Sequence, residues 1–427
     1  MNRNDNVRAI PFLSTVNQKA LNFDLEKVCS VSLSHLNVYC CLVCGKYLQG
    51  REPNSPAFSH SVNENHHIFV RFQTQRFYIL PEGKIIKPVD YNEVLKTIRD
   101  NISPTYEPEA VRLFPVNCTD VSSHTYYNGF IPLYDSSQRD FANVVIVMLS
   151  HIPPIRDTFL VGMDTDKFDP LVKLFGLILR KHWSKNLLRA HVLTDELLSY
   201  ISINYPKLLE NKDPRVFLLS LLNALISKCP QLKQSFDCIK GRIDSQDIDD
   251  DGKITKRRLL PFTCLTLDLP EDSVFKSSSV DETILQTNME DLMKKYDGEQ
   301  ETLVGNTIKR YRIAELPDYL ILHYHRFDPN SKQPVKNRKR AIVTFPTSIK
   351  ILDVDFVLIE NVVHKQETKN SPLKKIITDD YSSKWGIQLN NKSTGRWMEF
   401  YGNHIKQKDE EFLFLDETYI QLWKKQN

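Results

Sequence analysis

Two cysteines and two histidines near the N-terminus could together hold a metal ion. Cys41 and Cys44 are separated by two residues, so both thiolates can face one ion from a turn, and Gly45 relieves the backbone after them. His60 and His66 follow downstream. Two sulfur and two nitrogen donors are the tetrahedral set that zinc prefers in a structural site. The spacing therefore predicts one structural zinc ion held by these four side chains.

Three neighbouring residues compete for a place in this site. Cys29 and Cys40 precede the cysteine pair, and His67 directly follows His66, so the choice between His66 and His67 as fourth ligand stays open. The alternative is that the cysteines are core thiols and the histidines lie on the surface. We favour the metal, because such donors seldom coincide in so short a window.

The composition limits the classes of function. The chain has 427 residues, enough for two or three domains, and its net charge of +3 gives no general argument for a nucleic-acid-binding surface. Eight cysteines, four of them crowded near the N-terminus, do not form a secreted disulfide framework. No apolar run approaches the length of a membrane span, and the first residues have no apolar secretion signal.

The segment after the cysteines supplies the elements that would position the zinc ligands. Residues 68–72 and 76–80 read as two strands with a turn at 73–75, and residues 90–100 read as a short helix. With residues 23–35 upstream, this region resembles the ubiquitin-protease-type zinc finger, ZnF-UBP. Relatives use that finger to grip the free C-terminal carboxylate of ubiquitin, for which they need an arginine and aromatic pocket residues. No such pocket can be assigned from this sequence, so we expect a scaffold role.

A second stretch opens on an acidic residue. Asp140-Phe141-Ala142-Asn143 leads into the apolar run 144–149, and a proline pair at 153–154 ends the pattern, which predicts a buried helix. An acidic side chain in the first helical turn faces the positive end of the peptide dipoles and can cap free N–H groups. The stretch resembles the box of ubiquitin-specific proteases in which a cysteine opens this helix.

Further stretches resemble the same protease family in the same order: 211–225, 316–327, 341–346 and 418–423. A connection that contains prolines, 104–126, separates them from the finger. The resemblance implies an α+β protein. An N-terminal segment and ZnF-UBP finger would occupy residues 1–118. A papain-like ubiquitin-specific-protease domain with thumb, palm and fingers would occupy residues 119–427.

The resemblance also implies that the catalytic residues are missing. A cysteine protease needs a thiolate, a histidine base and an Asn or Asp that orients the base. Asp140 stands at the nucleophile position, Lys384 at the base position in 382–389, and Tyr401 at the orienting position after Trp397. A carboxylate is a poor nucleophile toward an amide, and a lysine here is protonated. We therefore predict no protease activity, and assign neither Cys118 nor His364 a catalytic role.

Three other stretches receive plainer interpretations. Asp247 to Arg258 matches an EF-hand loop except at position twelve, where Arg258 replaces the bidentate glutamate, so we expect an acidic surface loop. Cys229, Cys238 and Cys264 lack paired spacing, so we expect no second zinc site. The basic run 332–340 is interpreted as a solvated hairpin tip, with contact to RNA or an acidic partner as the alternative.

A ZnF-UBP finger joined to a protease fold without its triad resembles the splicing-factor branch of the ubiquitin-specific protease family. Residues 41–47, 140–143 and 265–270 narrow the match. The resemblance implies a nuclear, non-catalytic pre-mRNA splicing factor. Members of this branch assemble or maintain the spliceosomal tri-snRNP, so we expect the chain to bind tri-snRNP proteins. Any contact with snRNA would be indirect. The alternative is a ubiquitin-binding or weakly active deubiquitinase-like protein.

Overall fold

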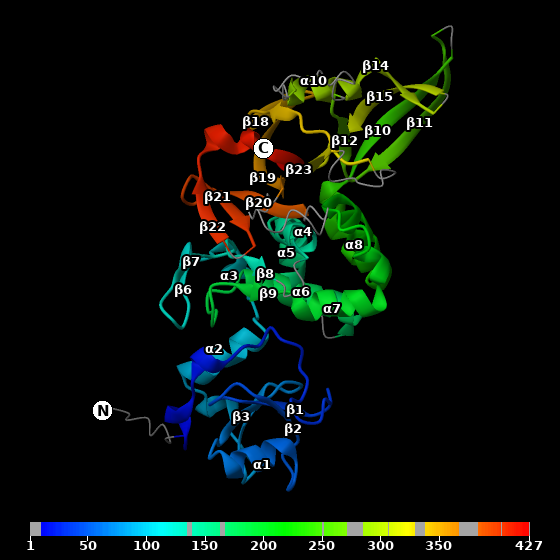
Figure 1. Ribbon diagram of the computed structural model, residues 1–427. Coiled ribbons are helices and arrows are strands. Elements are labelled where there is room, and N and C mark those ends of the chain that lie inside the picture. The colour runs from blue at the N-terminus through cyan, green and yellow to red at the C-terminus, as the bar shows by residue number, and fades with distance from the viewer. Residues whose placement is uncertain are drawn as a thin grey trace, which may run out of the picture. The chain divides into compact units, whose positions relative to one another are not determined.

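The chain folds into two compact units (Figure 1). A computed structural model describes residues 10–134, 139–162, 167–249, 252–270, 285–305, 307–328, 338–366, 383–402 and 404–426. The first unit comprises Met1–Ser137 with Phe159–Asn204, and the second comprises Gln138–Thr158 with Tyr205–Asn427. The first unit thus combines the finger with a later stretch of chain. The domain boundary expected between residues 118 and 119 stays a prediction.

The first unit is built around a five-stranded antiparallel sheet in the order β2-β1-β3-β4-β5. Side chains alternate between its two faces, as the strand period requires. Val38 and Cys40 of β1 pack in a core with α2, whereas Tyr39 and Cys41 pack in a core with α1. The elements are β1 (Val38–Cys41), β2 (Tyr47–Gln49), α1 (Pro56–Asn63), β3 (Ile68–Arg71), β4 (Arg76–Ile79), β5 (Lys84–Ile85) and α2 (Glu93–Ile102).

Short elements complete the first unit: α3 (Pro108–Arg112), β6 (Asn117–Thr119), β7 (Thr125–Tyr127), β8 (Leu133–Tyr134), α6 (Pro170–His182), β9 (Val192–Leu193) and α7 (Asp195–Asn204). The stretch 104–126, expected as a connection, holds α3 and part of the β6–β7 hairpin. Prolines do not exclude these elements, because a proline fits the first turn of a helix such as α3.

Polar contacts tie the finger to helices α6 and α7 within this unit. The Asp24 carboxylate accepts hydrogen bonds from Lys181 Nζ at 2.6 Å and from the backbone N–H of Leu193 at 3.0 Å. Lys27 forms an ion pair with Glu196. The Lys181 side chain is only 4% exposed, so the Asp24 carboxylate compensates a buried charge.

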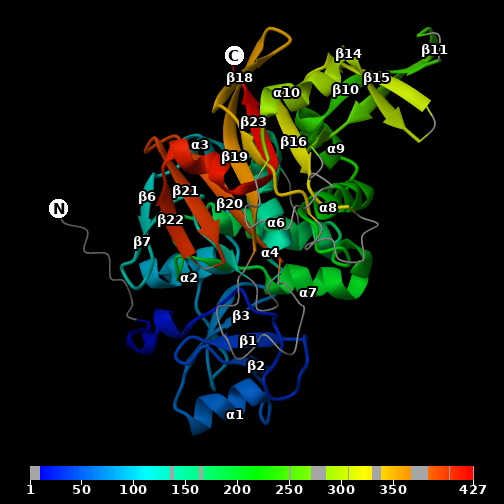
Figure 2. The ribbon, with the colours of Figure 1, turned by 45° about the horizontal axis from the view of Figure 1, so that its top comes forward.

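An eight-stranded sheet is the framework of the second unit (Figure 2). Its order is β12-β16-β23-β19-β20-β21-β22, and β18 pairs with β19. All pairings are antiparallel except that of β12 with β16. The strands are β12 (Leu265–Asp268), β16 (Tyr319–His325), β18 (Ser348–Ile351), β19 (Val354–Gln366), β20 (Ser383–Asn391), β21 (Arg396–Tyr401), β22 (His404–Lys408) and β23 (Glu417–Lys425).

Helices α4 (Asp140–Ser150) and α8 (Pro214–Lys228) pack on one another, and α4 also packs on β20. Every residue of α4 after the first is buried, as predicted. Asp213 caps α8 by accepting the N–H of Val216 at 3.0 Å. The unit also contains α5 (Pro153–Asp157), α9 (Leu232–Phe236), α10 (Met289–Met293), β13 (Gln286–Asn288) and β17 (Ile342–Thr344). Among the described residues, no single helix is long and apolar enough to cross a membrane.

A separate four-stranded sheet in the order β11-β10-β15-β14 contains the EF-hand-like stretch. Its strands are β10 (Gly241–Ile248), β11 (Ile254–Phe262), β14 (Asp297–Val304) and β15 (Thr307–Glu315). Asp247 lies in β10 and Arg258 in β11, and their side chains pair at 2.8 Å. The stretch expected to be an acidic surface loop is thus largely a β-hairpin, because β10 and β11 pair with one another. Asp250 and Asp251 lie outside the described residues.

The interpretation of the basic run as a solvated tip is wrong at its C-terminal end. Arg338 is 4% exposed, and two of its nitrogens donate to the Glu417 carboxylate at 2.7 Å each. Lys339 Nζ donates to the carbonyl of Leu269 at 2.9 Å. Both side chains therefore bind other parts of the fold instead of pointing into solvent. The Arg338 guanidinium is buried, and a buried guanidinium needs a carboxylate partner. Residues 329–337 of the run lie outside the described part of the chain.

Candidate functional site

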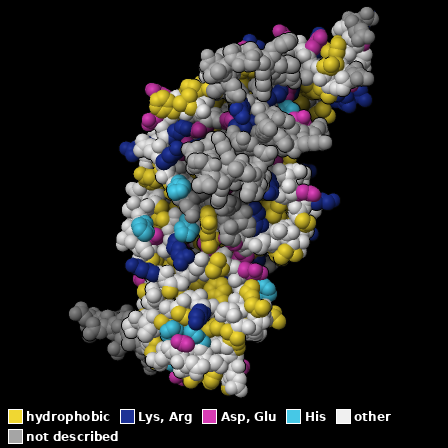
Figure 3. Space-filling view, in the orientation of Figure 1, with side chains coloured by type: hydrophobic (Ala, Val, Ile, Leu, Met, Phe, Trp, Pro, Cys, Tyr) yellow, Lys and Arg dark blue, Asp and Glu magenta, His cyan; other side chains and the backbone are white. Residues whose placement is uncertain are grey.

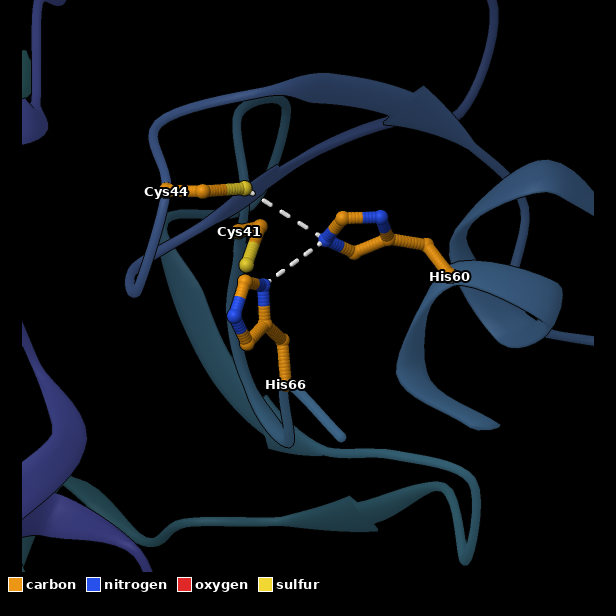
Figure 4. Close-up of side chains that lie close together, drawn as sticks. All are labelled: Cys41, Cys44, His60 and His66. Atoms are coloured by element: carbon orange, nitrogen blue, oxygen red, sulfur yellow. Dashed lines mark hydrogen bonds between the residues drawn. The ribbon is translucent and has the colours of Figure 1, made fainter. Parts of the chain in front are cut away.

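Four side chains from separate elements of the finger converge on one point (Figure 4). Cys41 ends β1, Cys44 lies in the turn after it, His60 comes from α1, and His66 precedes β3. One donor atom from each lies within 4.8 Å of all the others. Cys44 Sγ is 3.4 Å from His60 Nε2, which is 3.1 Å from His66 Nδ1. Donors of a tetrahedral zinc ion lie about 3.3–3.8 Å apart, so the cluster has the size to hold zinc.

The backbone around the cysteine pair explains this convergence. Gly45 has φ +77°, and a Cβ atom there would lie 2.3 Å from the Ala20 carbonyl oxygen. Only glycine combines that conformation with so close an approach, which lets the turn bring Cys44 beside Cys41. The turn is closed by the Gly45 N–H, which donates to the Cys41 carbonyl at 2.9 Å.

The competing residues lie elsewhere. His67 has both ring nitrogens engaged, Nδ1 with the Leu80 carbonyl at 2.8 Å and Nε2 with Asn65 at 2.7 Å. Cys40 points into the hydrophobic core on the α2 side of the sheet. Cys29 is buried, and its sulfur accepts the N–H of Gln49 at 3.2 Å. His66 rather than His67 therefore joins the cluster.

The electrostatics of the cluster favour a dication. Burial raises the pKa of the Cys41 thiol to about 12, so a metal charge is needed to hold it as a thiolate. Burial also lowers the pKa of His60, which keeps its imidazole neutral and able to donate a lone pair. Two thiolates and two neutral imidazoles suit a closed zinc site, and such an ion supplies structural stability rather than catalysis.

A cluster of an arginine and two tyrosines lies on the α1 side of the same sheet. Arg51 Cζ lies 5.3 Å from the ring centroid of Tyr78, and the rings of Tyr39 and Tyr78 meet edge to face at 5.4 Å. Both tyrosines are buried, whereas the Arg51 side chain is 39% exposed. The sequence prediction missed this cluster. The available signal was the alternation of side chains along β1, which places Tyr39 on the same face of the sheet as Cys41.

Asp140 connects two elements of the second unit. One carboxylate oxygen accepts the N–H of Phe141 at 2.9 Å, and the other accepts the N–H of Trp385 in β20 at 2.8 Å. Burial raises the pKa of Asp140 to about 6, although these N–H groups and the charge of Lys384 oppose the shift. The side chain thus fastens the start of α4 to β20.

Lys384 and Tyr401 lie on the neighbouring strands β20 and β21. Lys384 Nζ is 5.7 Å from the centroid of the Tyr401 ring, and Lys365 Nζ is 5.4 Å from the same ring. Lys365 and Lys384 stand opposite one another in the β19–β20 pairing. The structure therefore brings Asp140, Lys384 and Tyr401 into one region, which offers a carboxylate, an ammonium and a phenol.

His364 and Cys118 are both buried. His364 Nδ1 is 2.8 Å from Glu417, and its buried ring packs 5.0 Å from that of Trp385. Burial raises the pKa of the Cys118 thiol, which makes it inert. The other cysteines, Cys229, Cys238 and Cys264, are buried or half-buried free thiols. Across the part of the chain that the structure describes, the finger holds the one group able to bind a metal.

Comparison with known families identifies both parts of the chain. The profile described as "Zn-finger in ubiquitin-hydrolases and other protein" matches residues 29–90. The profile described as "Ubiquitin carboxyl-terminal hydrolase" matches residues 134–423. The chain belongs to the ubiquitin carboxyl-terminal hydrolase family. The predicted zinc finger and protease-like domain are thereby confirmed, and the Cys/His cluster lies inside the finger's match.

Two of three similar proteins have names that refer to splicing. Pre-mRNA-splicing factor SAD1 of Saccharomyces cerevisiae is 37% identical over 97% of this chain and 93% of its own. Probable mRNA-splicing protein ubp10 of Schizosaccharomyces pombe is 30% identical over 97% and 88%. Ubiquitin carboxyl-terminal hydrolase 39 of Homo sapiens is 32% identical over 98% and 80%. The predicted resemblance to the splicing-factor branch of this family is confirmed.

Solved structures agree with the fold. The crystal structure of an essential yeast splicing factor superposes with a TM-score of 0.86 at 37% identity, covering 97% of this chain and 99% of that one. The SAGA Ubp8/Sgf11/Sus1/Sgf73 DUB module superposes with a TM-score of 0.52 at 15% identity, covering 98% and 92%, which shows a shared fold alone. The predicted α+β fold class is confirmed.

Proposed function

We propose that this chain is a non-catalytic pre-mRNA splicing factor. It acts as a protein-binding scaffold that promotes assembly or stability of the spliceosomal tri-snRNP, and it works in the nucleus. The similarity to SAD1, 37% identity over 97% of the chain with a fold match at a TM-score of 0.86, supports this function. Its partners are tri-snRNP proteins, and contact with snRNA is indirect.

The absence of catalysis is part of the proposal. Asp140, Lys384 and Tyr401 stand where the nucleophile, the base and the orienting residue of the family would be. Their proximity across α4, β20 and β21 supports this assignment. A carboxylate bound by two backbone N–H groups is occupied and weakly nucleophilic, and a lysine ammonium cannot accept a proton.

The zinc ligands and the domain limits also belong to the proposal. One structural zinc ion is bound by Cys41, Cys44, His60 and His66. His67 is not a ligand, because its two ring nitrogens contact Leu80 and Asn65. Residues 1–118 form the N-terminal segment and finger, and residues 119–427 form the inactive protease domain.

The function can be tested by depleting the protein from cells and complementing with variants. Cells depleted of this protein should lose tri-snRNP on a glycerol gradient, and the wild-type chain should restore it. Asp140→Asn should restore it equally, because no hydrolysis is needed. Cys41→Ser with Cys44→Ser should restore it poorly, because the finger loses its metal. Intact tri-snRNP in depleted cells would refute the proposal.

A second candidate function is recognition of the ubiquitin C-terminus by the finger. The Arg51–Tyr78 contact favours it, because an arginine beside aromatic rings is what relatives use to hold that carboxylate. Titration should then show binding of ubiquitin, loss of binding when the two C-terminal glycines are removed, and loss with Arg51→Ala. Equal signals for the two ubiquitin forms, or no binding, would remove this candidate.

A further inference from the structure

One loop of the finger exposes its aliphatic side chains and turns its serine hydroxyl groups toward the protein. In the segment Ser30–Asn37, the aliphatic side chains of Val31, Leu33 and Leu36 are 68%, 75% and 70% exposed. The serines between them use their hydroxyl groups within the finger instead. Hydrophobic side chains also show at the surface of the finger in Figure 3, at the lower end of the view. Turns normally expose polar side chains, so this arrangement needs a cause outside the folded chain.

Hydrogen bonds hold this loop in one conformation. The Ser30 hydroxyl donates to the Tyr47 carbonyl at 3.0 Å, and that of Ser32 donates to the Gln49 side chain at 2.7 Å. The Ser34 hydroxyl accepts the Leu36 N–H at 3.1 Å and a Gln49 side-chain N–H at 3.2 Å. These bonds fasten the loop along the edge of β2, so the aliphatic side chains are presented by a rigid backbone.

Cys29 anchors the start of the loop. Its sulfur accepts the N–H groups of Val31 at 3.5 Å, Ser32 at 3.4 Å and Gln49 at 3.2 Å. Its backbone N–H donates to the Ser34 carbonyl, and its carbonyl accepts the Leu33 N–H, both at 3.0 Å. The two backbone bonds therefore hold the loop at the point where Leu33 projects.

Leu33 itself is held in an unfavourable conformation. Its φ of +56° lies in the left-handed region, where a residue with a large side chain is disfavoured by roughly 1–2 kcal/mol and where Gly or Asn fit far better. A leucine that is 75% exposed buries too little apolar surface to offset much of this cost. Folding alone would favour Asn or Gly at this position, so the leucine side chain has a use beyond folding.

We propose that the loop Ser30–Asn37 is a docking knob that inserts Leu33, flanked by Val31 and Leu36, into an apolar pocket of a folded protein partner. Rigid presentation lowers the conformational entropy lost on binding, and a large side chain in a desolvated pocket supplies most of the energy of a protein interface. The proposal rests on the proposed function only in expecting a tri-snRNP protein as that partner.

The chemistry of the loop selects this class of partner. Residues 29–37 contain no lysine or arginine, and the one histidine, His35, lies 3.8 Å from the Glu26 carboxylate, so the loop offers no permanent cation to an RNA phosphate. Three aliphatic side chains offer roughly a few hundred Å², well below the ~800 Å² per partner of a standard stable interface. The loop therefore does not make a dimer by itself. A convex apolar projection of this size fits a concave apolar pocket.

Two variants separate binding from folding. Leu33→Asn places a residue that tolerates positive φ at the strained position, so its melting temperature should equal or exceed that of the wild type. Val62→Ser is the control, because Val62 is an exposed aliphatic residue on α1 of the same finger, 55% exposed. A Leu33→Asn protein that unfolds earlier would assign the leucine a folding role and overturn the proposal.

Site-specific photocrosslinking of the full chain then tests the knob. A photoreactive amino acid at position 33 or 36 should crosslink one and the same identified protein in cell extract, and one at position 62 should not. That protein, purified, should bind Leu33→Asn about tenfold or more weakly than wild type, and Val62→Ser should bind equally. Crosslinks to RNA, to a second copy or to nothing, or unchanged affinity of Leu33→Asn, would overturn the proposal. A partner outside the splicing machinery would keep the docking knob and contradict only the expectation that the partner is a tri-snRNP protein.

Discussion

At the scale of single residues, Asp140 shows how a protease-like helix terminus can become a structural contact. Its carboxylate bridges Phe141 in α4 and Trp385 in β20. These are interactions that a cysteine thiol would make weakly, because sulfur is a poor hydrogen-bond acceptor. The acidic residue therefore stabilises the junction of α4 and β20 in a way that does not depend on catalysis.

Asp140 should make stability depend on pH. Its folded pKa of about 6 lies above the ordinary value of 3.8, so the folded state binds the proton more tightly than the unfolded state. This contribution is present below about pH 4 and is lost as the pH rises through 6. Relative to Asp140→Asn, the wild type should therefore lose about 1–2 kcal/mol of unfolding free energy between pH 4.5 and pH 7.5. Urea unfolding of both proteins at the two pH values measures this, and a constant difference would contradict it.

Zinc binding should depend on the predicted ligands one by one. Metal analysis should find about one zinc ion per chain, and Cys44→Ser should lose it, because a hydroxyl is a far weaker zinc ligand than a thiolate. His67→Gln is the matched control, since His67 lies beside His66 but bonds Leu80 and Asn65 instead. Retention of zinc by Cys44→Ser, or its loss from His67→Gln, would contradict the ligand set.

The sequence identified the four clustered metal donors because ligand type and spacing carry that information directly. It could not choose His66 over His67, since that choice depends on a hydrogen bond to the carbonyl of Leu80, which is distant in sequence. The Arg51–Tyr78 contact was missed for the same reason, because it forms only when β4 is placed in the sheet.

At the scale of elements, buried charges fasten the strands of the large sheet. Glu417 at the start of β23 accepts from Arg338 and lies 2.8 Å from His364 Nδ1 in β19. Burial opposes its ionisation, but hydrogen bonds from His364 and Arg338 hold the pKa of Glu417 at about 2. The carboxylate is thus charged at any pH at which the protein is used, and it neutralises the buried guanidinium.

Glu417→Gln should be strongly destabilising. The change removes the negative charge that two nitrogens of the buried Arg338 guanidinium contact, and losses of about 3–5 kcal/mol are typical for a broken buried pair. Glu93→Gln is the matched control, because Glu93 pairs with Lys96 on the surface and its side chain is 89% exposed. Denaturant unfolding should show a loss of several kcal/mol for the first variant and almost none for the second. Equal effects would show that Glu417 is not the partner on which Arg338 depends.

Element prediction succeeded where periodicity was strong and failed where pairing decided the outcome. The apolar run after Asp140 lies in a buried helix as predicted, and strands β3 and β4 begin where they were predicted and end one residue earlier. Helix α2 was expected at 90–100 and spans Glu93–Ile102, because Asn92 caps it by accepting the Leu95 N–H. The pairing of β10 with β15 and the burial of Arg338 against Glu417 depend on distant partners, which local sequence does not encode.

At the scale of the whole molecule, the finger is part of a larger compact unit rather than a separate module. Asp24 holds Lys181 of α6, and Lys27 pairs with Glu196 of α7, so the finger and these helices stabilise one another. The division of the chain into its two compact units was not foreseen, because it joins stretches that are distant in sequence.

Removal of zinc should therefore destabilise elements outside the finger. Hydrogen exchange of the metal-free protein should accelerate in the finger and also in α6 and α7, because their anchoring contacts come from residues next to the zinc-bound sheet. Helix α8 of the second unit is the internal control and should exchange at its original rate. Acceleration confined to the finger would contradict the coupling.

The central claim is that the molecule acts in splicing by binding and not by hydrolysis. The most direct measurement is the amount of tri-snRNP in cells whose only copy of the protein carries Asp140→Asn, compared with wild-type and depleted cells. We expect wild-type levels of tri-snRNP with the variant and a loss of tri-snRNP in depleted cells. Tri-snRNP that is unchanged on depletion, or that is lost with Asp140→Asn although the variant protein is folded and abundant, would contradict it.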